Sequence, residues 1–392
     1  MRTRPLTLKA TPGAGLGALV CAVLGALVLA GCAATTNSAV NITGGTLDVY
    51  VSHPPAGAGG QTAADVLDAE TLAFRRSGGQ IGKFTVKLVA ATGKEVSDNA
   101  RSAIQDSSAI AYLGEIVPGT SQASVEINNE LGLLEVSPTD TAAYLTQSTP
   151  AVSGAPGLYY PSSSTYHETF ARVVPTTVQE AKAIVAEMQA LHLHTVSVAS
   201  DGQPYGASIA AEVKQDASAA GLSVTAGSAA DAVFYGGNDA AAATRALDAA
   251  AAANPSAKLF APSALYEDSF AAGLSVAAQK SLYVSSPGFA SGSLSPAGQQ
   301  FETAFRAAYG HAPVPEAIFG YEAMSALLAV FKEAGRAAGN RAIVVSDFRS
   351  LKDPSDSVLG TAYSIVGGDT TLTGPFVFAR AQSGRLVPVP QG

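Results

Sequence analysis

Residues 109–146 read AIAYLGEIVPGTSQASVEINNELGLLEVSPTDTAAYLT, and their pattern predicts a fold class. The apolar run at 109–114 predicts a buried strand, residues 121–130 a helix and residues 133–136 a second strand. A strand, a helix and a strand in this order form a βαβ unit with parallel strands. A polar turn follows each strand, and ligands of such folds bind beyond the carboxyl ends of the strands.

The same alternation extends along the rest of the chain. Further strands are expected at 46–52, 83–90, 195–199, 232–235 and 258–261. Further helices are expected at 61–76, 97–105, 180–191, 207–219, 240–253, 296–309 and 321–338, before a C-terminal hairpin at 374–379 and 384–388. Residues 147–167, rich in Pro, Ser, Gly and Tyr, are expected to form a loop. Repeated βαβ units imply an α/β fold with parallel sheets covered by helices on both faces.

Composition excludes several classes of protein. The chain has 392 residues, 47% of them hydrophobic and 14% charged, with a formal net charge of −8. This length predicts two domains or one large one, and the apolar fraction predicts an ordered core. The acidic balance argues against nucleic acid as a partner. Two Cys cannot form a four-thiolate metal centre or a disulfide-rich scaffold.

The N-terminus has the layout of an export signal. A basic start precedes an uncharged run at 13–30, which ends in Leu29-Ala30-Gly31-Cys32. The last four residues resemble a bacterial lipobox, which implies cleavage after residue 31 and lipidation of Cys32. The alternative is an uncleaved anchor helix, for which the apolar run is near the short limit. Residues 32–45 are small and polar, and we expect them to form a flexible tether.

Several segments resemble a known family, and they occur in the family's order. They are VSHPPAGAGGQ, RRSGGQIGKFTVKLV, AIAYLGE, ELGLLEVSPTDTAAYLT, FARVVPTT, SVASDGQPYGASIAAEVKQ, FETAFRAAYGHAPVPEAIFGYEAM and TGPFVFARAQSG. Nearly the whole mature chain resembles a type I periplasmic binding protein of the branched-chain amino-acid binding family of ABC importers. The resemblance implies two Rossmann-like lobes joined by a three-stranded hinge that crosses near Arg172, Pro287 and Gly374. It assigns 46–172 and 287–373 to the N-terminal lobe, and 173–286 and 374–392 to the C-terminal lobe. The ligand would lie between the lobes, and hinge closure would bury it.

Two turns of the N-terminal lobe are candidates to bind an anion. Residues 118–121 and 137–141 each lie between a strand and a helix, where free N–H groups and the helix dipole favour a carboxylate. The second turn resembles the family's carboxylate-binding loop, which implies roles for Thr139 and Thr141. For Thr141 the alternative is a helix N-cap. In the first turn a proline replaces the family's binding serine, so Thr120 or Ser121 is the candidate substitute.

The C-terminal lobe both matches the family and departs from it. Tyr205 matches the family's cleft tyrosine, although a tyrosine packed on the surface is the alternative. Asn238 stands where the family often has another aromatic residue. Ser263 stands where amino-acid binders place an acid for the ligand's ammonium group. A buried cation without a counter-charge costs about 3–5 kcal/mol. The ligand is therefore not expected to be a simple α-amino acid, unless a nearby acid supplies the charge: Asp140, Glu115, Asp239 or Glu267.

Motifs for catalysis are absent from the sequence. It contains no G-x-S-x-G elbow, H-E-x-x-H helix, P-loop or EF-hand pattern. The glycine-rich turn at 57–60 is interpreted as a cleft loop, beside which His53 is a candidate ligand contact. We therefore expect a monomeric binding protein rather than an enzyme, with no cofactor, no metal site and no nucleic-acid partner.

Two functions remain open from the sequence. The first is a lipid-anchored solute-binding protein on the outer face of the cytoplasmic membrane or in the periplasm. It would capture a small polar ligand, such as an amino acid or a related compound, for an ABC permease. The alternative is a ligand sensor or scaffold on the same fold, with a degenerate pocket and a protein partner.

Overall fold

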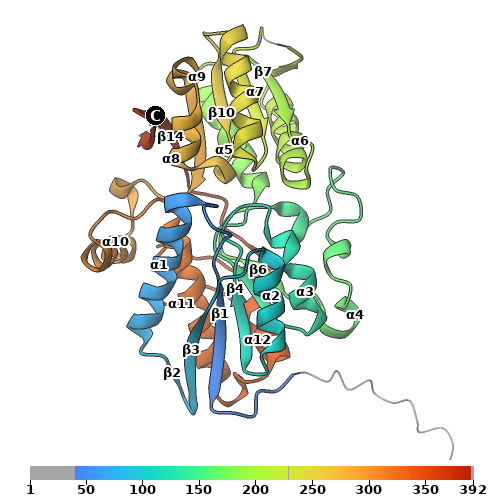
Figure 1. Ribbon diagram of the computed structural model, residues 1–392, viewed down its shortest axis with the longest axis vertical. Coiled ribbons are helices and arrows are strands. Elements are labelled where there is room, and N and C mark those ends of the chain that lie inside the picture. The colour runs from blue at the N-terminus through green and yellow to red at the C-terminus, as the bar shows by residue number, and fades with distance from the viewer. Residues whose placement is uncertain (1–39, 228, 390–392) are drawn as a thin grey trace, which may run out of the picture. The chain divides into compact units, whose positions relative to one another are not determined.

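The computed structural model describes residues 40–227 and 229–389. Within this part, two separate large sheets are each accompanied by helices, as Figure 1 shows. We call each sheet with its helices a lobe. This arrangement confirms the predicted fold class of parallel α/β sheets in two lobes. The proposed signal sequence and Cys32 lie outside the described residues.

The first lobe is built on a six-stranded sheet of order β2-β3-β1-β4-β5-β6. All neighbouring strands are parallel except β2 and β3. The strands are β1 (Thr46–Ser52), β2 (Gln80–Ile81), β3 (Phe84–Ala91), β4 (Ala109–Leu113), β5 (Leu134–Ser137) and β6 (Phe170–Arg172). The helices are α1 (Gly60–Ser77), α2 (Val96–Gln105), α3 (Val125–Glu130), α4 (Ser163–Tyr166), α10 (Pro296–Tyr309), α11 (Ala317–Ala334) and α12 (Arg341–Arg349). A short pair, β12 (Ile365–Val366) and β13 (Asp369–Thr370), follows them.

Alternating side chains of the first sheet form two cores. In β1, Val49 and Val51 belong to the buried cluster that includes Met324 of α11. Tyr50, on the opposite face, belongs to the cluster that includes Ala100 of α2. Successive residues of a strand point to opposite faces, so a strand buried on both sides reads as a continuous apolar run. This is why the sequence predicts β1 correctly.

The second lobe has a seven-stranded sheet of order β15-β14-β11-β10-β9-β7-β8. Its strands are β7 (Thr195–Ser200), β8 (Ser223–Thr225), β9 (Ala232–Gly236), β10 (Lys258–Ala261), β11 (Leu282–Pro287), β14 (Phe376–Gln382) and β15 (Arg385–Val389). Its helices are α5 (Thr177–Ala190), α6 (Pro204–Ala219), α7 (Ala240–Ala253), α8 (Asp268–Gly273) and α9 (Val276–Ser281). The antiparallel strands β14 and β15 form the expected C-terminal hairpin.

Both faces of the second sheet are buried as well. Phe260 of β10 belongs to a cluster with residues of α5 and α6, and its neighbour Leu259 to a cluster with residues of α7 to α9. The first of these clusters continues into the first lobe through Tyr144 and Phe170. Apolar side chains of the two lobes are therefore packed into one buried cluster.

The chain passes between the two sheets three times. It leaves the first sheet after Arg172 and enters α5, and it leaves the second after Pro287 and enters α10. It returns from β13 to β14 by way of residues 371–375. The first of these connections begins at Arg172, whose contacts with the site are described below.

Residues 147–167 differ from the loop that the sequence predicts. They contain a 3-10 turn at Gly157–Tyr159 and the single-turn helix α4. Tyr159 and Tyr160 are buried in the cluster shared by the two lobes, and the Tyr160 hydroxyl donates to the Leu145 carbonyl at 2.6 Å. Aromatic burial therefore orders a segment whose Pro and Gly content alone predicts irregular structure.

No helix in residues 40–227 or 229–389 combines the length and the apolar character needed to span a membrane.

Candidate functional site

The loops that follow the central strands of the two sheets are in direct contact. In each sheet the strand order reverses at one point, between β1 and β4 in the first lobe and between β7 and β9 in the second. Ligands of open α/β sheets bind at such points. The amide of Asn238, after β9, donates to the carbonyl of Pro118, after β4, at 3.2 Å. The site is thus a cleft between the lobes, and in this structure the cleft is closed.

Two further hydrogen bonds close the cleft beside the first. The backbone N–H of Gly59 donates to Glu267 Oε1 at 3.0 Å. The hydroxyl of Thr62, in the first turn of α1, donates to the carbonyl of Tyr266 at 3.0 Å. These bonds join the glycine-rich turn and the start of α1 to the second lobe. The interpretation of that turn as a cleft loop fits its position.

Asp140 occupies the position that the sequence predicts for an anion. Its carboxylate accepts hydrogen bonds from the backbone N–H groups of Gly119 at 2.7 Å, Ser121 at 2.9 Å and Ala142 at 3.0 Å. Asp140 itself is fully buried. The hydroxyl of Ser121 accepts from the backbone N–H of Glu115 at 3.2 Å. The first predicted anion-binding turn therefore directs two of its amides at a carboxylate of this chain, and the residue that follows the second turn supplies a third.

The hydroxyls of two predicted site residues are engaged by nearby backbone. Thr139 Oγ1 donates to the carbonyl of Ile116 at 2.5 Å, and Thr120 Oγ1 donates to the carbonyl of Val117 at 2.6 Å. Thr139 is fully buried, whereas Thr120 is half-buried at the wall of a cavity. In the closed cleft these two hydroxyls thus hold the turns in place.

A second buried carboxylate, Glu180 of α5, lies beside Ser263. Its oxygens accept from the Ser263 N–H at 2.6 Å, from the Ser263 hydroxyl at 3.1 Å and from the Ser285 hydroxyl at 2.6 Å. Across the cleft, Thr141 Oγ1 lies 3.4 Å from Glu180 Oε2. Burial raises the pKa of Glu180, and these hydrogen bonds oppose the shift. Glu180 thus supplies an acid at Ser263, where the sequence analysis found none.

Sequence reasoning missed Glu180, although its helix contains a signal. The buried positions of α5 include Glu180, Ala181, Ile184 and Val185, so a carboxylate lies on the apolar face of the helix. A charged residue at such a position is rarely buried unless it has partners. The helical periodicity of residues 177–190 would have revealed this exception.

Tyr205 lies at the closest approach of the two lobes. Its side chain is 2% exposed, and a Cβ added to Gly119 would lie 2.7 Å from Tyr205 Cβ. Burial raises the pKa of the Tyr205 phenol well above its usual value, and the neighbouring Thr141 and Ser263 hydroxyls act in the opposite direction. Tyr205 is therefore inside the cleft, and the alternative of a surface tyrosine is wrong for this structure.

The four acids that the sequence offers as counter-charges for a ligand differ in burial and in hydrogen-bond partners. Asp140 is held by backbone amides, and Glu267 accepts the Gly59 N–H. Asp239 is exposed and caps α7, where it accepts from two N–H groups of the first turn. Of these four acids, only Glu115 is among the residues that line a cavity of about 370 Å³. His53 follows β1 but is not among the residues that line that cavity.

Two cavities along the cleft differ greatly in size. The smaller one, the central space between Pro118 and Ser263, has room for about one water molecule. A second space of about 370 Å³, the cleft-mouth cavity, opens between the loops after β1 and β4 and Asn238. Its charged lining residues are Glu95 and Glu115, with no basic residue among those that line it.

Glu115 is the buried acid of the cleft-mouth cavity. It accepts from the Tyr112 hydroxyl at 2.5 Å and from the Ser52 hydroxyl at 2.8 Å. Burial raises its pKa to about 7, although these two hydrogen bonds act to lower it. Its charge therefore changes near neutral pH, and a cation at the cavity would favour the charged form.

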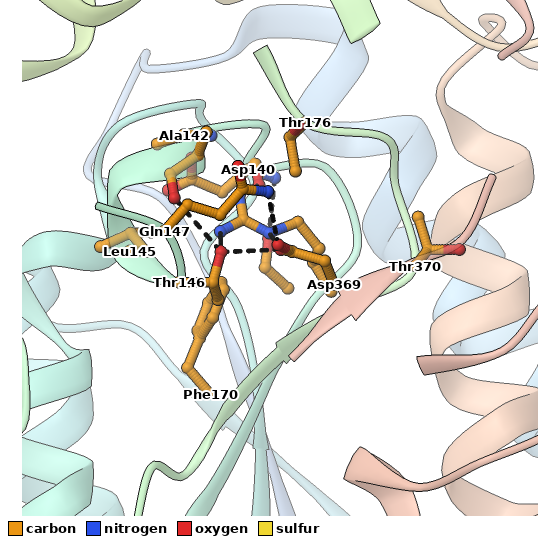
Figure 2. Close-up of polar contacts among 12 residues, drawn as sticks. Asp140, Ala142, Leu145, Thr146, Gln147, Phe170, Thr176, Asp369 and Thr370 are labelled. Carbon is orange, nitrogen blue, oxygen red and sulfur yellow. Dashed lines mark hydrogen bonds and ion pairs between the residues drawn. The ribbon is translucent and has the colours of Figure 1, made fainter. Parts of the chain in front are cut away.

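Arg172, at the point where the chain first leaves the first lobe, is hydrogen-bonded to the backbone of the Asp140 turn. Figure 2 shows the partners of its guanidinium group, which is fully buried. Nη1 donates to the Asp140 carbonyl at 2.7 Å, Nη2 donates to Thr146 Oγ1 at 3.1 Å, and Nε is paired with Asp369 Oδ1 at 2.9 Å. Gln147 also donates to Asp369, at 2.8 Å. This network ties β6 to β13 and fixes the backbone of the anion-binding turn.

Within residues 40–227 and 229–389, no group of three or more His, Cys, Asp or Glu side chains is arranged to hold a metal ion.

Comparisons with known proteins agree with this architecture. Residues 225–385 match the family model described as periplasmic binding protein. No curated protein matches the chain significantly.

Several solved structures share the fold. A leucine binding protein from Thermotoga maritima has a TM-score of 0.71 at 17% identity, over 88% of this chain and 98% of that one. A substrate-binding protein of an ABC transporter from Desulfitobacterium hafniense, in complex with Leu, has a TM-score of 0.67 at 19% identity, covering 88% and 100% of the two chains. A solute binding protein from R. palustris, in complex with benzoate, has a TM-score of 0.63 at 19% identity, covering 88% and 96%.

Proposed function

We propose that the chain is a type I periplasmic binding protein that captures a small polar solute between its lobes for an ABC importer. It acts by binding rather than by catalysis, as a monomer outside the cytoplasm. A lipid on Cys32 anchors it to the membrane through the tether at residues 32–45. The partner in the membrane is an ABC permease that accepts the solute.

One observation carries this proposal: polar groups from both lobes converge in one cleft. Thr141 belongs to the first lobe, whereas Glu180, Tyr205 and Ser263 belong to the second, and all four are buried together. Three chain crossings connect the lobes, which is the architecture of a hinge that opens and closes on a ligand. Related structures with Leu or benzoate bound support a small solute as the ligand class.

A second function, sensing or scaffolding with a degenerate pocket, is favoured by a different observation. The central space has room for about one water molecule, and Ser263, which lines it, has its N–H and hydroxyl bonded to Glu180. A protein that never binds a solute would need no larger space. The two functions differ in whether a small molecule stabilises the protein.

A thermal-shift screen of the full chain in detergent separates the two functions. The panel contains amino acids, amides, amines, aromatic acids, short peptides and nucleosides. A ligand at 100 times its Kd adds about 2.7 kcal/mol of stability, which raises Tm measurably. We expect at least one solute to do so. If the whole panel leaves Tm unchanged, the sensor or scaffold function takes the place of the importer.

Tyr205→Ala locates the binding event once a ligand is found. We expect affinity measured by calorimetry to fall at least tenfold without unfolding, because the ring lies where the lobes meet. Tyr205→Phe separates the ring from the hydroxyl, and Tyr166→Ala in the distant helix α4 is the control. Unchanged affinity in Tyr205→Ala would place the ligand elsewhere.

A further inference from the structure

The amides that face the cleft from the first lobe have a permanent occupant. Gly119, Ser121 and Ala142 come from two separate turns, yet their three N–H groups converge on the two oxygens of Asp140. Convergent backbone N–H groups of this kind form the usual protein site for a carboxylate or phosphate. Here the side chain that fills the site is part of the same chain and is fully buried.

The Asp140 carboxylate cannot leave these amides easily, because its backbone is fixed on both sides. Its N–H donates to the Ser137 hydroxyl at 2.8 Å, and its carbonyl accepts from Arg172 Nη1 at 2.7 Å. If the side chain moved away, it would leave three buried donors without their present partner, which is unfavourable. A ligand carboxylate would therefore have to displace a better positioned one.

The remaining space around the cleft is acidic. Two acids, Glu95 and Glu115, line the cleft-mouth cavity, and Glu267 and Glu316 line the small central space. No Lys or Arg is among the residues that line either space. An anionic group placed here would meet acids and no cation, whereas an ammonium group would be attracted to these acids and would favour their charged forms.

We infer that Asp140 is a built-in substitute for a ligand carboxylate, so that the cleft excludes carboxylates and selects a carboxylate-free amine. This inference concerns the ligand class of the cleft and rests on the proposed solute-binding function. It assigns Asp140 a specificity-determining role, in which its carboxylate blocks the amides. Its removal would convert the same amides into an open anion site.

The experiment is a gain of anion binding in Asp140→Ala, with formate as the probe. The full chain is purified in detergent, and Tm is measured with and without 100 mM sodium formate against the same concentration of sodium chloride. We expect formate to raise the Tm of Asp140→Ala by at least about 3 °C, because it restores partners to three buried N–H groups. Wild type, whose amides are occupied, should show no such shift.

Asp239→Ala is the matched control. Asp239 also accepts from two backbone N–H groups, but it is exposed, so water replaces its carboxylate. Formate should leave the Tm of this variant unchanged. If Asp140→Ala does not fold, refolding yield with formate against chloride gives the same readout. Absence of any formate effect on Asp140→Ala, in Tm or in yield, would overturn the assignment.

The ligand class is tested on wild type with two matched pairs. Leucine is compared with 3-methylbutylamine, which lacks only the carboxylate, and benzoate is compared with benzylamine. We expect the amine of each pair to raise Tm. The apparent affinity of the matching carboxylate, derived from its Tm shift, should be at least tenfold weaker. Stabilisation by leucine or benzoate equal to that by the amine would overturn the inference and leave the solute-binding function intact. Formate rescue of Asp140→Ala with no response of wild type to the amines would keep Asp140 as the occupant of the amides and overturn the amine selectivity; only a response of wild type to no member of the whole panel would remove the solute-binding function.

Discussion

Replacing Arg172 with Met should destabilise the protein more than any change at an exposed arginine. The guanidinium group of Arg172 is fully buried, and it joins the Asp140 carbonyl, Thr146 and Asp369. Methionine keeps most of the apolar length of the side chain, so the lost free energy comes from polar contacts rather than from an empty cavity. The change leaves the Asp369 carboxylate, 15% exposed, without its cation.

The magnitude follows from the burial of this ion pair. Breaking a buried pair by removing one partner costs about 3–5 kcal/mol, because the other charge stays desolvated. With a slope of about 3 kcal/mol per molar urea, the unfolding midpoint of Arg172→Met should fall by about 1 M or more. Asp369→Asn combined with Arg172→Met should cost less than the sum of the single changes, with a coupling of about 1 kcal/mol or more.

The assay is urea unfolding followed by circular dichroism, and Arg101→Met is the control. Arg101 lies 3.6 Å from Asp98, with side chains that are 56% and 48% exposed. Exposed pairs contribute about 0–1 kcal/mol, so its midpoint should move by no more than about 0.3 M. Equal shifts for the two variants would refute the view that Arg172 fixes the hinge and the Asp140 turn.

Three further changes test other parts of the structure. The folded-state pKa of Glu115, about 7, is raised above its usual value of 4.5, so its contribution to stability is present at low pH and is lost as pH rises through about 7. Between pH 5 and 7.5, the free energy of unfolding measured with urea should fall by about 2 kcal/mol more in wild type than in Glu115→Gln, which has no charge to lose or gain there. Identical pH profiles for the two proteins would contradict the burial argument. Gly119→Ala should open the cleft and raise the radius of gyration in X-ray scattering, because its Cβ would meet Tyr205 across the cleft. Gly57→Ala is the control, since Gly57 also has a positive φ but has open space around it. Equal radii for the two variants would show that the lobes tolerate the contact. Cys32→Ser should abolish labelling by radioactive palmitate while Cys21→Ser retains it, and label that persists on Cys32→Ser would rule out the lipobox.

Much of the fold could be predicted because its elements are long and periodic. The strand at Thr46–Ser52 and the helices at Ala240–Ala253 and Pro296–Tyr309 have the predicted bounds. Each has a clear apolar pattern, and the two helices also have N-caps, Asp239 before α7 and Ser295 before α10. The helices Asp268–Gly273 and Val276–Ser281 were not expected, since six residues give too few turns for a period to be recognised.

The site was predictable in position and less so in chemistry. The turns beyond β4 and β5 were identified as anion sites, because strand ends and free amides can be inferred locally. The sequence could not predict that the Asp140 carboxylate accepts from those amides. Its partner Gly119 is 21 residues away, and the side-chain rotamer depends on the packed fold. Glu180 lies 83 residues before Ser263, and only the tertiary structure brings the two together.

The three hydrogen bonds between Gly59 and Glu267, Thr62 and Tyr266, and Asn238 and Pro118 have a kinetic consequence. At about 0.5–1.5 kcal/mol each, these three bonds alone would reduce the open form to between about one molecule in ten and one in two thousand. A solute can reach the cleft only in that minority. Its observed binding rate should therefore rise with concentration at first and then level off at the rate at which the lobes separate. Uptake would then be limited by a motion of the protein rather than by the abundance of its solute.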